Sequence, residues 1–175
     1  MPYINDLLLE YENFYEFEIV HDEKFYHSLV TQHKHFTPTC DYPKYRKLLA
    51  DCHVALMPLL KNKFNSMKSD LKFVEASGYA VASIASPTVY GNVIESGFNG
   101  EVVNDGKRVA EILKLWGDNP DLAQACALNA RNWVRSHRLQ SQQSIARLNW
   151  YQDLYQRRDD LTKALLQRVP ELSLE

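Results

Sequence analysis

Residues 65–100 read NSMKSDLKFVEASGYAVASIASPTVYGNVIESGFNG, and this stretch decides the fold. A polar loop leads into a predicted helix over residues 70–78, which stops at Gly78. An apolar strand is expected over residues 80–86, closed by Pro87, and a glycine-containing turn follows at residues 97–100. A strand that is apolar at nearly every position is typical of a parallel sheet with both faces covered. The stretch therefore predicts an α/β protein.

The same alternation of strand and helix continues on both sides of this stretch. Strands are predicted at residues 17–20, 34–39, 53–59 and 101–103, a loop at 60–68, and helices at 4–11, 23–30, 42–52, 90–96 and 107–116. Strands separated by helices pair in parallel, and the connecting helices cover the two faces of the sheet. The expected architecture is a three-layer α/β/α, Rossmann-like parallel sheet.

The chain changes character after residue 120. Helices are predicted over residues 121–135 and 141–169, and the second one carries a stripe of Trp150, Leu154, Leu161 and Leu165. We expect residues 1–138 to form the sheet domain and residues 139–175 to form a helical extension. If the domain leaves the stripe uncovered, the stripe predicts self-association or docking to another domain.

Composition excludes several classes of partner. The formal net charge of −2 gives no electrostatic reason to expect nucleic acid. No apolar run approaches the roughly 20 residues of a membrane span, and the N-terminus lacks the features of a signal peptide. A cytoplasmic location is the expectation, with Cys40, Cys52 and Cys126 as reduced thiols.

The usual motifs for cofactors and metals are missing from the sequence. Neither the glycine-rich dinucleotide fingerprint nor the P-loop pattern occurs, so no cofactor is predicted. His27, His33 and His35 have no cysteine or carboxylate at a recognisable ligand interval, and we interpret them as surface loop residues. No metal site is predicted.

The residues around the predicted 70–78 helix have the chemistry of an anion and sugar site. Ser69 is a plausible N-cap, and the free N–H groups of the first turn, beside Lys68, favour a phosphate. Lys72 and Glu75 lie on the same helical side as Lys68, where the Glu75 carboxylate can accept both hydroxyls of a ribose. The competing interpretation is a solvated helix face on which Lys72 and Glu75 form an ion pair.

Three blocks of sequence, residues 48–58, 72–83 and 94–100, resemble the C-terminal, donor-binding domain of GT-B glycosyltransferases of family 4, the retaining enzymes often labelled group 1. The resemblance covers residues 41–138. It implies a nucleotide-sugar-binding half of a transferase that uses a UDP- or GDP-sugar and an acceptor hydroxyl, in the synthesis of a cell-surface polysaccharide or glycan. In that family the second glutamate of a Glu-x7-Glu motif binds the ribose, and Glu75 stands at its place.

The resemblance also implies roles for other residues. The loop Asn65-Ser66-Met67-Lys68-Ser69 resembles a variant, Asn-x-x-Lys-Ser, in which the lysine and serine contact phosphate or sugar. The segment 87–91, with Tyr90 and Gly91, is expected to approach the donor. The donor-binding residues predicted in this way are Glu75, Lys68, Ser69, Lys72, Asn65, Tyr90 and Gly91.

The sequence departs from the family pattern in two ways. Met67 stands where the first motif glutamate is expected. The family's donor domain also begins with a strand and a glycine-containing loop that we do not find here, so the chain is expected to be a fragment, a natural remnant or a divergent subunit. Its expected partner is an N-terminal acceptor domain or a separate subunit, without which the chain is inactive.

Two other functions are compatible with the sequence. In the first, the chain is a non-catalytic, Rossmann-like interaction module whose C-terminal helices bind a partner. In the second, it is a nucleotide-sugar epimerase of similar fold, although no acid/base pair for that reaction is evident.

Overall fold

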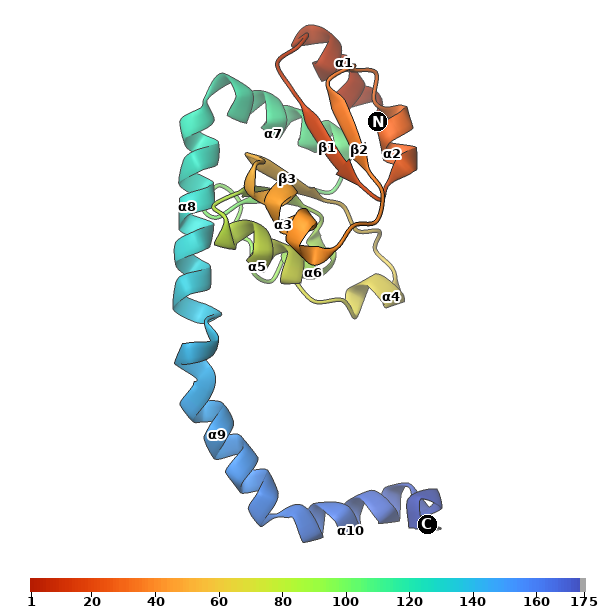
Figure 1. Ribbon diagram of the computed structural model, residues 1–175, viewed down its shortest axis with the longest axis vertical. Helices are drawn as coiled ribbons and strands as arrows, with labels where there is room; N and C mark the ends of the chain where they lie inside the picture. Colours follow the sequence, from red (N-terminus) through yellow and green to blue (C-terminus); the bar gives the residue numbers. More distant parts are fainter. Residues whose placement is uncertain (174–175) are drawn as a thin grey trace. The chain divides into compact units, whose positions relative to one another are not determined.

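The computed structural model describes residues 1–173, and the chain falls into two compact units, Met1–Arg135 and Ser136–Glu175. Unit 1 alternates helices with parallel strands, which confirms the predicted α/β class (Figure 1). Its elements are α1 (Pro2–Glu10), β1 (Phe17–Val20), α2 (Glu23–Ser28), β2 (Lys34–Thr37), α3 (Tyr42–Ala50), β3 (Val54–Met57), α4 (Lys63–Ser66), α5 (Leu71–Gly78), β4 (Ala82–Ala85), α6 (Pro87–Tyr90), β5 (Glu101–Val102), α7 (Gly106–Asp118) and α8 (Pro120–His137).

The strands form two parallel sheets, where the sequence led us to expect one. β1 pairs with β2, so that Phe17 lies opposite Lys34. β3, β4 and β5 form a three-stranded sheet in that order, with Val54 opposite Ala82 and Ile84 opposite Glu101. Because all pairing is parallel, the carboxyl ends of the strands within each sheet meet at one edge, where ligands bind in such folds.

β4 separates two hydrophobic cores. Ala82 and Ile84 belong to a core that also contains residues of α1, α7 and β1, whereas Val81 and Ala85 face a core built by α5, α6 and β3. Successive side chains of a strand point to opposite faces of the sheet, so this alternation produces helical layers on both sides. All four residues of β4 are buried, as its uninterrupted apolar sequence predicts.

Two local predictions in unit 1 are wrong. The helix predicted at 90–96 begins at Pro87 and ends at Tyr90, because Pro87 occupies its first turn and Ser86 is its N-cap. After it, the Asn99 side chain bonds the backbone N–H of Glu95 and the carbonyl of Val93, which fixes a turn instead of a helix. The predicted loop 60–68 contains the single-turn helix α4, capped by Asn62.

Unit 2 contains α9 (Gln140–Gln156), α10 (Arg158–Arg168) and the 3₁₀ turn Pro170–Ser173. The single helix predicted over 141–169 is therefore wrong, because the chain leaves helical geometry around Arg157. The predicted stripe is divided by this break, with Trp150 and Leu154 on α9 and Leu161 and Leu165 on α10. Neither helix has a buried residue.

Within residues 1–173, no helix combines the length and the apolar character that crossing a membrane requires.

We predict that Gly117→Ala destabilises unit 1 by about 1–3 kcal/mol, the usual cost of overpacking. A methyl group at Gly117 on α7 would overlap the hydroxyl of Tyr15, which donates a 2.9 Å hydrogen bond to the carbonyl of Leu113. Thermal unfolding followed by circular dichroism measures the effect. Gly78→Ala is the control, because a methyl group there meets nothing within 4 Å; equal melting temperatures for the two variants would contradict the prediction.

Candidate functional site

Hydrogen bonds lock together the loops that leave the carboxyl ends of β3 and β4. The backbone N–H of Leu59 donates to Ser86 Oγ at 3.0 Å, and Thr88 Oγ1 donates to the carbonyl of Leu59 at 3.2 Å. These hydrogen bonds, each of which involves a side chain, continue the contact beyond the point where the backbone hydrogen bonds between β3 and β4 end. They hold the loops at the edge of the sheet where the sequence predicts the donor site.

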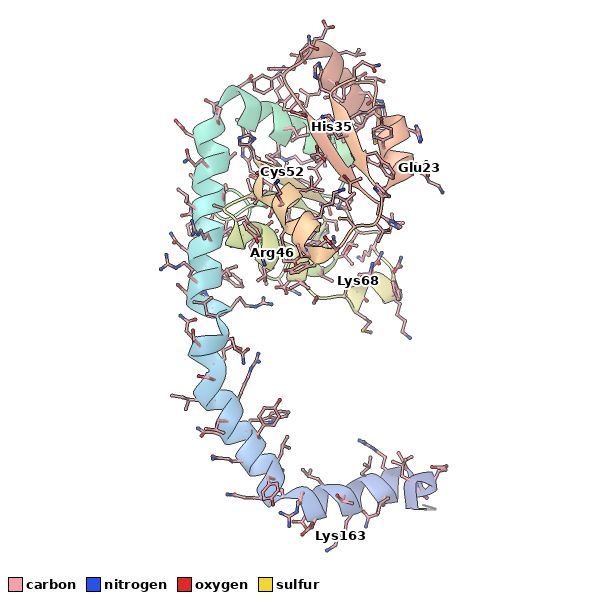
Figure 2. All side chains as sticks on the ribbon, in the orientation of Figure 1. Glu23, His35, Arg46, Cys52, Lys68 and Lys163 are labelled. Carbon is pink, nitrogen blue, oxygen red and sulfur yellow. The ribbon has the colours of Figure 1, made fainter. Side chains whose placement is uncertain are left out.

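The predicted residue Asn65 shapes the loop that follows β3. Its side-chain amide donates to the carbonyl of Leu60 at 2.8 Å, and its backbone N–H is capped by Asn62 at 2.8 Å. Lys68, at the end of this loop, is exposed, and its Nζ lies 5.1 Å from the centre of the Phe64 ring (Figure 2). The Lys68 ammonium group thus remains available to an anion.

The N-cap of α5 is Asp70, so our assignment of Ser69 to that position is wrong. Both residue types are good caps, and the helix begins one residue later than the serine would require. The first-turn N–H groups of an α-helix have no partner inside the helix, and they attract anions. The Asp70 side chain makes no capping hydrogen bond to these groups, and its charge contributes, after burial, to raising the pKa of Tyr90.

Glu75 lies half-buried on α5, among side chains of α3 that the sequence analysis did not associate with it. A hydrogen bond with Glu75 raises the pKa of the Tyr42 hydroxyl. Lys72 Nζ lies 5.6 Å from the centre of the Tyr45 ring, and the Tyr42 and Tyr45 rings stack with centroids 6.2 Å apart.

Arg46 completes this group. Its Nε donates to the Tyr79 hydroxyl, and its guanidinium lies 5.8 Å from the Tyr42 ring and 5.7 Å from the Tyr79 ring. We call the set of Tyr42, Tyr45, Arg46, Lys72, Glu75 and Tyr79 the Glu75 cluster; Figure 2 labels Arg46 within it. One carboxylate with two cations and three phenols can bind polyhydroxyl and anionic groups, and the aromatic faces can hold a planar ring.

A shallow depression of about 300 Å³ adjoins the Glu75 cluster. It is lined by Val20, His21, Thr39, Cys40 and Tyr45. Val20 is the last residue of β1, His21 follows it, and Thr39 and Cys40 follow β2. Tyr45 links the depression to Lys72. His21 Nδ1 lies 3.0 Å from Thr39 Oγ1, which joins the two strand ends. Sequence reasoning missed His21 and Thr39, although His21 stands directly after one predicted strand and Thr39 is the last residue of another.

Tyr90 and Gly91, the last two predicted donor-binding residues, differ in solvent exposure. Tyr90 is only 2% exposed and packs in the core beside Phe73, so its ring faces the protein interior. Gly91 is exposed at the C-terminal end of α6. The backbone of this segment, rather than the Tyr90 ring, is what the structure presents at the edge of the sheet.

A second polar group lies on β1 and β2. Glu16, Glu18 and His35 bring one ligand atom each to within 4.8 Å of one another, and His35 Nε2 is 2.8 Å from Glu16 Oε1. All three side chains are exposed, and Glu18 lies opposite His35 in the strand register. The sequence gave no sign of this grouping, because it depends on strand pairing. An exposed ion pair explains the contact.

Comparison with known proteins rests on structure. No family model matches the chain, and a search of curated proteins finds no match. Among solved structures, the C-terminal domain of LpcC, a glycosyl transferase group 1 family protein from Francisella tularensis, matches with a TM-score of 0.55 and 18% identity over 66% of this chain. TarM matches with a TM-score of 0.63 and 16% identity over 83% of the chain.

A third match is Anabaena Alr3699/HepE in complex with UDP-glucose, with a TM-score of 0.56 and 16% identity over 77% of the chain. The chain spans 59%, 30% and 40% of these three structures. At such low identity the likeness establishes the fold. The chain thus has the Rossmann-like fold of the C-terminal domain of GT-B glycosyltransferases.

We predict that the free energy of unfolding falls at alkaline pH because of the raised pKa of Tyr45. Burial, with a smaller contribution from Glu75, raises its pKa to about 12. The unfolded chain loses this proton near pH 10, its ordinary value, whereas the folded chain keeps it. The contribution of the protonated Tyr45 hydroxyl to the free energy of unfolding is fully present below pH 10 and is lost as the pH rises towards 12.

Urea unfolding between pH 8 and pH 11 tests this prediction. The midpoint should fall less steeply above pH 10 in Tyr45→Phe than in the original chain, with Tyr3→Phe, at an exposed position of α1, as the control. Parallel curves for the original chain and Tyr45→Phe would contradict it.

Proposed function

We propose that the chain is the nucleotide-sugar-binding half of a retaining glycosyltransferase, which transfers a sugar from a UDP- or GDP-sugar to an acceptor hydroxyl. The observation that carries the proposal is the position of Glu75, beside the depression at the carboxyl ends of β1 and β2. In open parallel sheets this edge is where nucleotides bind. The fold shared with three glycosyltransferase structures, one of them in complex with UDP-glucose, supports the same reading.

In the proposed complex, Glu75 accepts hydrogen bonds from the ribose hydroxyls and replaces its contact with Tyr42. Lys68 and Lys72 attract the diphosphate, assisted by the first-turn N–H groups of α5. The Gly91 backbone approaches the sugar. Catalysis then depends on positioning and on electrostatic stabilisation of the departing diphosphate, while the acceptor hydroxyl attacks from the same face of the sugar.

A second candidate function is a non-catalytic interaction module, and Met67 is the observation that favours it. In the resembling family a glutamate at this place contacts the transferred sugar, whereas Met67 is apolar and 76% exposed. Asp70 at the start of α5 also weakens the attraction for a phosphate. Nucleotide binding distinguishes the two functions, because a module that only binds proteins has no reason to bind UDP.

The partner of the proposed transferase half is an acceptor domain or separate subunit, without which we expect no sugar transfer. The exposed apolar residues of α9 and α10 are candidates for this contact or for self-association. They do not form one continuous stripe, because the helix breaks between Leu154 and Leu161.

We predict that the chain binds UDP or GDP and that Glu75→Gln weakens this binding about tenfold or more, since hydrogen bonds to a charged group contribute about 1.5–3 kcal/mol. The amide keeps the size of the side chain but replaces one acceptor oxygen with a donor. Titration calorimetry measures the affinity, and Glu95→Gln, on an exposed turn, is the matched control. If the unaltered chain binds neither nucleotide at millimolar concentration, the interaction module becomes the better function.

We predict a different signature for Lys68→Ala. Loss of the ammonium group should weaken UDP binding several-fold and leave uridine binding nearly unchanged, because the proposed contact is with phosphate alone. Ligand-observed NMR with both ligands measures the two affinities. Lys63→Ala, in the same loop, controls for a general loss of positive charge; equal losses for UDP and uridine would mean that the variant disturbs the loop as a whole.

A further inference from the structure

The loop between β3 and α5 exposes apolar side chains that the fold does not bury. Leu60 is 80% exposed, and Phe64 and Met67 are each 76% exposed. Among the described side chains these are the three most exposed large apolar residues, and all of them lie in the short segment 60–67. Single exposed apolar residues are ordinary, whereas a group of them in one place marks a surface that binds something.

The three side chains are held close together by the backbone of the loop. Phe64 and Met67 are three residues apart across the turn of α4, and the backbone N–H of Met67 donates to the carbonyl of Phe64 at 3.2 Å. Residues at this spacing share one side of a helical turn. The Asn65 side chain donates to the carbonyl of Leu60 at 2.8 Å, which holds Leu60 beside the same turn.

The polar side chains of the loop, by contrast, are turned towards its backbone. The Asn62 side chain accepts a hydrogen bond from the N–H of Asn65 at 2.8 Å, and Ser66 Oγ donates to the carbonyl of Lys63 at 2.8 Å. The loop thus keeps its shape through hydrogen bonds rather than through burial of its apolar residues. Replacement of the exposed apolar side chains should therefore leave the loop folded.

Lysines accompany these apolar side chains. Lys61, Lys63 and Lys68 are exposed, and the sequence has no acidic residue between Asp51 and Asp70. Because the formal net charge of the chain is −2, this concentration of positive charge is local. Lys68 Nζ, 5.1 Å from the centre of the Phe64 ring, places an ammonium group directly beside the apolar group (Figure 2). Figure 1 shows α4 at the periphery of unit 1, where a large partner can reach it.

We propose that this patch binds the surface of an anionic lipid bilayer. The patch consists of Leu60, Phe64 and Met67 with the three lysines Lys61, Lys63 and Lys68. Lysines attract the anionic headgroups, while apolar side chains enter the boundary between headgroups and acyl chains. An acidic polypeptide would match the lysines and leave the apolar side chains in water, and an apolar protein surface would bury the charges. A bilayer accommodates both kinds of side chain at the same place.

The proposed contact also accounts for Met67. A glutamate at this place, as in the resembling family, would bring a negative charge against anionic headgroups, where like charges repel. Methionine is flexible and apolar, and it adapts to irregular surroundings. Because Lys61, Lys63 and Phe64 are not among the predicted donor-binding residues, the proposal does not depend on nucleotide binding.

Binding of the whole chain to lipid vesicles, measured by flotation, tests the proposal. The chain should bind phosphatidylcholine vesicles that contain about one-third phosphatidylglycerol, and bind vesicles of phosphatidylcholine alone about tenfold or more weakly. Raising NaCl from about 0.05 M to about 0.5 M should weaken binding to the anionic vesicles by a similar factor, because salt screens exposed charges. Equal binding to both kinds of vesicle, or no binding to the anionic vesicles at millimolar lipid, would overturn the proposal.

Two double variants separate the contributions of charge and apolar contact. Lys61→Ala with Lys63→Ala, and Phe64→Ser with Met67→Ser, should each lower binding to the anionic vesicles about tenfold or more. Circular dichroism should give both variants the melting temperature of the original chain, since all four side chains are exposed. Unchanged vesicle binding by the Phe64→Ser, Met67→Ser variant would contradict the proposal, because the contact would then be electrostatic alone.

Matched controls carry the same kinds of change elsewhere on the chain. Lys44→Ala with Lys47→Ala removes two exposed lysines from α3, and Ile145→Ser with Leu148→Ser removes two exposed apolar residues, three positions apart, from α9. Both controls should bind the anionic vesicles like the original chain, and losses equal to those of the patch variants would refute a specific patch.

Poly-L-glutamate represents an acidic polypeptide partner. It should compete with the anionic vesicles only weakly, because it offers nothing to the apolar side chains. If it binds the chain as tightly as the anionic vesicles do, an acidic protein is the better occupant and the proposal fails.

Discussion

Burial of β4 on both faces is the constraint on which the structure depends. Val81, Ala82, Ile84 and Ala85 are nearly inaccessible to solvent, and alternate members supply the two cores. Where the chain comes back closest to β4, there is no room for a large side chain. Gly100, with φ of +152°, lies against the strand, and a Cβ there would sit 3.0 Å from the carbonyl oxygen of Ser83. Packing around β4 thereby sets the positions of β5 and of the turn before it.

The same constraint positions the candidate site. Because β3 and β4 are parallel, the loops at Leu59 and Ser86 emerge at the same edge and are hydrogen-bonded to each other, and α5 follows the first of these loops in the chain. α5 must bury Phe73 and Ala76 against the sheet, so Lys72 and Glu75 are turned towards α3. The chemistry of the site is thus a consequence of helix periodicity, with three residues from α3 completing it. With a net charge of only −2, attraction for a diphosphate has to come from local groups such as these.

The separation of the strands into two sheets is related to the position of the candidate site. β1 and β2 lie on one side of the interruption and β3, β4 and β5 on the other, so the interruption falls where the strand order changes direction. Ligands of open α/β sheets bind at that switch point. The depression lined by His21, Thr39 and Tyr45 lies at its edge.

Local sequence determined most of the elements. The apolar runs at 53–59 and 80–86 and the strand at 17–20 were predictable because each is bounded by turn-forming residues, and the 42–52 helix because Asp41-Tyr42-Pro43 is a good helix start. The helix at 90–96 and the single helix at 141–169 were wrong, because the Asn99 turn and the break at Arg157 carry only weak local signals. Glu75 was identified by its place on a helix face and by family resemblance, and its contribution to a site stays a prediction.

The sequence by itself determined the α/β class, the parallel character of the strands and the polar face of α5, since each follows from the spacing of neighbouring residues. Only the tertiary structure decided that Tyr42 and Tyr45 meet Glu75 and Lys72, that Glu18 lies opposite His35, and that β1 does not pair with β3. These relations join residues far apart in the chain. They depend on how two cores pack around one buried strand, and local periodicity carries no information about that packing.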